Sequence, residues 1–83
     1  MKIIKYPVST EKSMRLMEAE NKLIFVVDNA ANKTMIKKEI ESMFKVKIDS
    51  VNTFVDREGR KKAYVKFNKA NPAIDVATEL GLM

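Results

Sequence analysis

Residues 32–55, NKTMIKKEIESMFKVKIDSVNTFV, change partway along from a helical pattern to a strand pattern, and this change decides the fold. Asn32 lies where its side-chain oxygen can cap the first free backbone N–H groups of a helix. The apolar residues that follow it recur at helical spacing and share one face: Ile36, Ile40, Met43 and Phe44. The sequence therefore predicts an amphipathic helix that begins after Asn32.

The second half of the stretch alternates between apolar and polar residues, which predicts a strand with one buried face. The apolar parity changes between Ile48 and Val51, which indicates a bulge near residues 49–50 or a strand that begins there. A helix that leads directly into a strand is the centre of a small α+β domain.

Three further segments have strand patterns. Residues 22–28, KLIFVVD, contain a continuous apolar run, which is typical of a central strand covered on both faces. Residues 62–68 alternate and should pair with residues 50–56 as an antiparallel hairpin around a turn that contains a glycine. Residues 1–8 include a proline, which favours an edge strand or an extended lead-in.

Two further helices are predicted outside these strands. One covers residues 11–20 and can be capped by Ser9 or Thr10. The other covers residues 73–80, with the asparagine of the Asn-Pro pair at 71–72 as its cap and the proline as its first residue.

The composition fits one small globular domain. The chain has 83 residues, of which 46% are hydrophobic, so a core can form and disorder is disfavoured. It has no cysteine, which suits a reducing cytoplasm. No apolar run reaches the roughly 18 residues that a membrane span needs, and the N-terminus lacks a signal-peptide core. We predict a single cytoplasmic α+β domain over residues 1–83, with no membrane insertion. Its antiparallel-dominated sheet should have three to four strands, packed with two to three helices.

The side chains that commonly carry catalysis are scarce. The chain has no histidine and no cysteine, and its acidic residues are scattered. Two glycines cannot form a Gly-rich phosphate cradle, and neither Ser9 nor Ser42 has a base partner. We therefore expect no enzyme activity, no cofactor, no metal site and no small-molecule substrate.

The charge favours a polyanionic partner. The net charge is +5, from 16 basic and 11 acidic residues, and cations that meet phosphates release condensed counterions. The alternatives are a soluble protein whose basic charge has no such role, and a protein–protein adaptor that binds no nucleic acid. The charge is densest along the predicted hairpin, at Arg57, Arg60, Lys61, Lys62, Lys66 and Lys69.

The hairpin can be interpreted in two ways. It can be a solvated surface, or it can be a clamp for an RNA backbone, with its cations directed outward. We expect Arg60, Lys61 and Lys62 to point to solvent. Tyr64 shares a strand face with Lys62 and Lys66, where an aromatic ring can stack on a base or simply pack.

Part of the hairpin resembles an RNA-recognition motif. Residues 60–67, RKKAYVKF, match part of the pattern K/R-G-F/Y-G/A-F-V-x-F/Y, but lysines replace the glycine and the first stacking aromatic. Residues 24–26 would form the companion strand. No strand follows the last predicted helix, and residues 1–20 are left unexplained. An RNA-recognition-motif-like protein that binds single-stranded RNA is the second hypothesis.

A second resemblance covers the whole chain. The sequence closely resembles the archaeal and eukaryotic type of the universal large-subunit ribosomal protein L23 family. Residues 7–12, PVSTEK, resemble the family's P-x-x-S/T-E-K opening, and residues 61–66, KKAYVK, are the most specific match. The other matching segments are Asn32-Lys33, Ile36-Lys37, Ile40-Glu41, residues 44–48, residues 51–53 and residues 80–82. Phe67 replaces the family's usual leucine, and the turn at 56–60 is short where bacterial members carry a long basic extension.

The resemblance implies a structural protein of the large ribosomal subunit. It would bind large-subunit ribosomal RNA beside the mouth of the polypeptide exit tunnel, next to the ribosomal protein L-twenty-nine. It would also form a docking site for signal recognition particle or other nascent-chain factors. The family's docking glutamate falls on Glu11, which by its position alone is an acid at the start of a helix. The candidate RNA-binding residues are Lys12, Lys33, Lys37, Asn52, Thr53, Arg57, Arg60, Lys61, Lys62, Tyr64 and Lys66.

Overall fold

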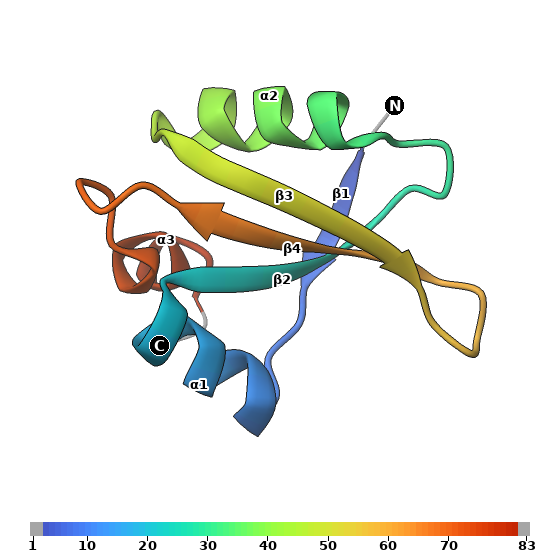
Figure 1. Ribbon diagram of the computed structural model, residues 1–83, viewed down its shortest axis with the longest axis horizontal. Coiled ribbons are helices and arrows are strands. Elements are labelled where there is room, and N and C mark those ends of the chain that lie inside the picture. The colour runs from blue at the N-terminus through green and yellow to red at the C-terminus, as the bar shows by residue number, and fades with distance from the viewer. Residues whose placement is uncertain (1–2, 82–83) are drawn as a thin grey trace.

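The computed structural model describes residues 3–81 as an antiparallel sheet packed with three helices (Figure 1). The elements in chain order are β1 (Ile4–Pro7), α1 (Glu11–Glu20), β2 (Lys22–Val27), α2 (Lys33–Phe44), β3 (Ile48–Val55), β4 (Lys61–Phe67) and α3 (Ala73–Glu79). The strand order is β1-β2-β4-β3, and every neighbouring pair is antiparallel. The predicted α+β class is confirmed.

The core lies between one face of the sheet and the helices. Alternate residues of β2 and β4 point into one cluster with buried side chains of all three helices: Leu23, Phe25, Val27, Ala63, Val65, Phe67, Met17, Ile36, Ile40, Val76 and Ala77. Helices α1 and α3 lie together at one end, whereas α2 lies over β3 (Figure 1). No helix among the described residues covers the other face of the sheet, and we call it the open face. Ile24 and Val26 of β2 are buried on that face, outside the core cluster, so β2 is buried on both sides as predicted, although no helix of residues 3–81 covers the second side.

Helix α2 begins as predicted, because the backbone N–H of Met35 donates to Oδ1 of Asn32 at 2.8 Å. Ile36 and Ile40 are completely buried. The prediction that Met43 joins them is wrong, since Met43 is 50% exposed. Its helix lies over β3, the last strand of the sheet, so part of the apolar face extends past the sheet edge.

Two local predictions about the strands and the first helix are confirmed. The β3–β4 register shifts between Ile48 and Ser50, which is the expected bulge. Thr10 caps α1 by accepting from the N–H of Ser13, and the Ser13 hydroxyl accepts from the N–H of Thr10 at 2.8 Å.

The predicted cap of the last helix is wrong by one residue. Pro72 occupies the capping position, and its ring has no group that can form a side-chain hydrogen bond. Asn71 does not cap the helix, because its Oδ1 accepts from the N–H of Lys47 at 2.9 Å. The cap comes from a distant residue: the N–H of Ala73 donates to Oδ1 of Asn21 at 2.6 Å. The start of α3 is thereby attached to the junction between α1 and β2.

Candidate nucleic-acid interface

The strand register places side chains on the open face in three rows that cross the sheet. The first row contains Tyr6, Val26, Lys62 and Phe54. The second contains Ile24, Tyr64 and Asn52, and the third contains Lys22, Lys66 and Ser50. Opposite residues of an antiparallel pair point to the same face, so these rows form a continuous surface. On β2 the surface has the apolar Ile24 and Val26 and, at one end, Lys22. The flanking strands add aromatic residues, lysines and the polar Asn52 and Ser50.

Two of the aromatic side chains on the open face are Phe54 and Tyr64, which form a pair. Their ring centroids are 5.1 Å apart and the rings meet edge to face, at 78°. Phe54 remains 41% exposed, and on β1, Tyr6 is 46% exposed. Exposed rings beside lysines are the combination that single-stranded nucleic acid stacks upon. The predicted position of Tyr64 between Lys62 and Lys66 is confirmed.

Tyr6 and Phe54 were not among the candidate residues. Phe54 could have been found from the alternation of β3, because its parity is opposite to that of the buried Val51 and equal to that of Asn52. Tyr6 had no such signal, since its place on the open face depends on the register between β1 and β2.

The hairpin turn carries an ion-pair network around one carboxylate. Asp56 lies 3.5 Å from Nε of Arg60 and 3.4 Å from Nζ of Lys62, and Nη2 of Arg60 lies 2.5 Å from Glu58. The N–H of Arg60 donates to Oδ1 of Asp56 at 2.9 Å, which is the main reason that the pKa of Asp56 lies below its ordinary value. A further bond from Nη1 of Arg60 to the Tyr6 hydroxyl, at 3.4 Å, raises the pKa of Arg60. The turn is thus held in place by residues that also face the open side.

The prediction that Lys61 points to solvent is wrong. Strand parity turns it to the helix-covered face, where its Nζ donates to the carbonyl oxygen of Ala31 at 2.5 Å. Thr53 lies on that same face, opposite the buried Ala63. Lys62 is on the open face, but it is only partly exposed and is paired with Asp56.

The candidate residues therefore do not form one patch. The structure brings Asn52, Arg60, Lys62, Tyr64 and Lys66 together on the open side of the sheet. Arg57 is exposed in the turn, Lys12 is exposed on α1, and Lys33 and Lys37 are exposed on α2, across the core from the open face. Lys66 is exposed, and no carboxylate among residues 3–81 pairs with it, which leaves its charge free for a ligand.

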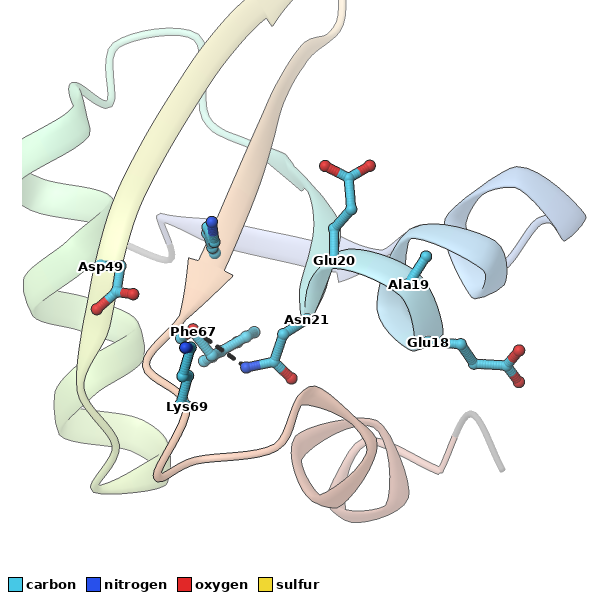
Figure 2. Close-up of a pocket in the computed structure, with 8 residues that line it drawn as sticks. Glu18, Ala19, Glu20, Asn21, Asp49, Phe67 and Lys69 are labelled. Atoms are coloured by element: carbon cyan, nitrogen blue, oxygen red, sulfur yellow. Dashed lines mark hydrogen bonds between the residues drawn. The ribbon is translucent and has the colours of Figure 1, made fainter.

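Two hollows border the open face. One, of about 260 Å³, is lined by Tyr6, Pro7, Val8, Ser9, Thr10, Val26, Arg60 and Lys62. The other, of about 390 Å³, lies between the end of α1 and the start of β3 (Figure 2). Its acidic side chains do not converge: Glu18 and Glu20 point away from each other and from Asp49. Within residues 3–81 there is accordingly no group of acidic residues placed to hold a metal ion.

The structure weakens the RNA-recognition-motif hypothesis. Phe25, in the supposed companion strand, and Phe67, at the end of the matching segment, are both buried in the core. The positions of β2 on the open face are Lys22, Ile24 and Val26, so the central strand offers no aromatic ring to a base.

Glu11 occupies the expected position. It is the first residue of α1, its side chain is 86% exposed, and it lies 3.2 Å from Nη2 of Arg15, one turn along. Such an exposed pair contributes little to stability, which leaves the carboxylate available to other partners.

Comparison with known proteins gives a consistent result. The family model for ribosomal protein L23 matches residues 2–70. The chain is 44% identical to a large ribosomal subunit protein uL23 of the archaeon Pyrobaculum aerophilum over 81 residues, which cover 98% of this chain and 100% of that protein. It is also 44% identical to a large ribosomal subunit protein uL23 of Trypanosoma brucei brucei, over 99% of this chain but only 50% of the longer protein. No helix within residues 3–81 is long and apolar enough to cross a bilayer.

Proposed function

Because the chain belongs to the ribosomal protein L23 family, in its archaeal and eukaryotic type, we propose that it binds large-subunit ribosomal RNA through the open face of its sheet. It is a structural constituent of the large ribosomal subunit in the cytoplasm, and it is not an enzyme. The observation that carries the RNA proposal is the surface on which Lys62, Tyr64 and Lys66 lie beside the exposed ring of Phe54.

Ribosomal RNA suits this surface for two physical reasons. The lysines of the rows, Lys22, Lys62 and Lys66, can approach phosphates, and each contact releases condensed counterions. The aromatic side chains can stack on unpaired bases or pack on sugars. Bases in duplex RNA are rarely available for such stacking, because they are paired and the major groove is narrow. We therefore expect the surface to contact a non-helical or irregular region of the RNA. Lys12, Lys33, Lys37 and Arg57 are proposed as separate contacts to other parts of the same RNA.

The finer location is also a proposal. Family membership supports a place beside the mouth of the polypeptide exit tunnel, next to the ribosomal protein L-twenty-nine. Glu11 would then serve as an anionic docking point for signal recognition particle or other nascent-chain factors. Its exposure at the start of a capped helix supports this role, because the carboxylate is presented on a rigid element.

The RNA proposal is tested by the salt dependence of binding to large-subunit ribosomal RNA. Lys66→Ala should weaken binding several-fold and reduce the log–log salt slope by about 0.7–0.9, the value of one lost phosphate contact. Tyr64→Ala should weaken binding with little change in slope, because stacking is not ionic. The matched control is Lys38→Ala, which removes an exposed lysine from α2 that is not among the candidates. Equal losses for Lys66→Ala and Lys38→Ala would show that binding depends on net charge alone and not on the open face.

A further inference from the structure

The two edges of the sheet are built differently. β1 has four residues and includes a proline, two features that usually keep other strands from adding to an edge. β3 has eight residues, and Asp49 is its only charged residue. That residue lies at the bulge, so the rest of the strand, residues 50–55, has neither a charge nor a proline to protect it.

The backbone groups of this edge alternate in direction. The N–H of Asp56 donates to the carbonyl of Arg60, and the N–H of Asn68 donates to the carbonyl of Lys47, both at 3.0 Å. Since bonding direction alternates along an antiparallel pair, the N–H and C=O groups of Ser50, Asn52 and Phe54 face β4. Those of the intervening residues, Val51, Thr53 and Val55, must face outward.

These outward groups have no partner within residues 3–81. No other described segment donates to or accepts from the backbone of Val51, Thr53 or Val55. At the start of β3, the N–H of Ile48 donates to the carboxylate of Glu41 at 3.1 Å, so this end of the strand does have a partner. An extended row of donors and acceptors therefore remains available over residues 51–55.

We propose that this edge is a docking site for an extended segment of a partner protein, which adds to the sheet as a fifth strand beside β3. Donors and acceptors alternating along the edge are matched by another polypeptide backbone. An RNA backbone offers mainly acceptor oxygens, with the 2′-hydroxyl as its one donor in each nucleotide, so it matches the alternating edge of Val51, Thr53 and Val55 less well than a polypeptide strand does. This proposal does not depend on RNA binding at the open face, because the edge and the face use different groups of β3.

The surroundings of the edge indicate the chemistry of the partner. Val55 is 62% exposed and Phe54 is 41% exposed, on opposite faces of the strand, so apolar side chains of an added strand would find contacts on both. Lys45, Lys47 and Arg57 are exposed at the two ends, which favours acidic residues in the segment. A second copy of this chain is less suited, because each chain carries a net charge of +5.

The test uses the full chain and a synthetic peptide of about ten residues in which central valines are flanked by glutamates at both ends. The same peptide with lysines in place of the glutamates is the charge control. Binding is followed by NMR of the backbone amides and by their hydrogen exchange. We expect the valine–glutamate peptide to bind at least about tenfold more tightly than the control and to protect the amides of Val51, Thr53 and Val55.

The matched variants are Val55→Pro and Val55→Ala. Val55→Pro removes an outward N–H without touching the bonds to β4, so it should weaken peptide binding by about tenfold or more. Val55→Ala keeps the N–H and should change the affinity by less than about threefold. Native amide spectra for both variants establish that the fold is retained. The proposal is overturned if neither peptide protects these amides, if the chain protects them by self-association without peptide, or if ribosomal RNA protects them in place of the peptide.

Discussion

Asn21 connects four parts of the chain. Its backbone adopts a left-handed conformation, with φ of 57°, where α1 ends. Its Nδ2 donates to the carbonyls of Phe67 and Asn68, at 3.1 and 3.3 Å, while its Oδ1 accepts from the N–H of Ala73. One side chain thus joins α1 and β2 to the end of β4 and the start of α3.

Asn21→Gly should lower the free energy of unfolding by about 2–3 kcal/mol, because it removes these bonds while glycine tolerates the left-handed backbone. Asn32→Gly is the matched control, since glycine at an ordinary helix cap costs only a few tenths of a kcal/mol. Urea denaturation of both variants measures the difference. Equal small losses would mean that the bonds of Asn21 contribute nothing net.

The predictability of a capping residue depends on how far away its partner lies in the sequence. Asn32 and Thr10 each accept from a backbone N–H three residues away. The local sequence pattern therefore predicted the cap Asn32 directly, and it limited the cap of α1 to Ser9 or Thr10. The partners of Asn21 lie 46 to 52 residues away. No local pattern encodes such a bond, so the sequence assigned the cap of α3 to Asn71 instead.

Glu11→Ala should leave RNA binding unchanged and cost no more than about 0.3–1 kcal/mol of stability, the usual contribution of an acid at a helix start. It should weaken recruitment of signal recognition particle to reconstituted ribosomes, more strongly at low salt. Glu18→Ala, another exposed acid on α1, is the control. If both variants recruit the factor like wild type at two ionic strengths, Glu11 has no docking role.

At the scale of elements, periodicity located helices and strands well but did not locate the edge of the sheet. The same spacing places Ile36, Ile40 and Met43 on one helix face, yet only the first two are buried. Similarly, the sequence shows that basic residues are dense at 57–62, but it does not show which face each one occupies. Strand parity places Lys61 on one face and Lys62 on the other. Which face a side chain occupies depends on register, and register is set by pairing between distant segments.

Ile40→Ala should lower the free energy of unfolding by about 2–5 kcal/mol, because it leaves a cavity in a completely buried site. Met43→Ala, on the same helix face but half exposed, should cost less than about 1 kcal/mol. Lys37→Ala should also cost less than about 1 kcal/mol, since Glu41, one turn away, bonds to the N–H of Ile48. Chemical denaturation ranks the three variants, and a larger loss for Met43→Ala would contradict the observed packing of α2.

The hairpin turn should respond to acid through Asp56. Backbone N–H groups of Arg60 and Glu58, together with Lys62, favour its charged form, so its pKa in the folded protein lies below the ordinary 3.8. A depressed pKa stabilises the folded state above the unfolded-state value, and this stabilisation is lost as the pH falls through the folded-state pKa. The melting temperature of wild type should therefore fall more than that of Asp56→Asn between pH 5 and pH 2. Parallel pH profiles would mean that the carboxylate does not support the turn.

At the scale of the whole molecule, the fold divides the surface into regions that suit different proposed partners. The open face carries the lysines and aromatic rings proposed to contact RNA, the β3 edge carries the backbone groups proposed to bind an added strand, and Glu11 is exposed at the start of α1. The sequence identified the basic hairpin and the family, but not that Tyr6 and Phe54 share a face with Tyr64. That arrangement arises only when β1 and β3 pair on opposite sides of β2 and β4.

Lysine acetylation of the chain bound to large-subunit ribosomal RNA, compared with the free chain by mass spectrometry, tests most directly whether the open face meets the RNA. Lys22, Lys62 and Lys66 lie on that face, whereas Lys38 is exposed on α2 and serves as the internal control. The proposed interface predicts that RNA slows acetylation of Lys66 and Lys62 by about tenfold or more while Lys38 reacts at nearly its free rate. Protection of Lys38 with continued reactivity of Lys62 and Lys66 would contradict it, and would leave the RNA in contact only with the helix-covered side, where Lys33 and Lys37 also lie.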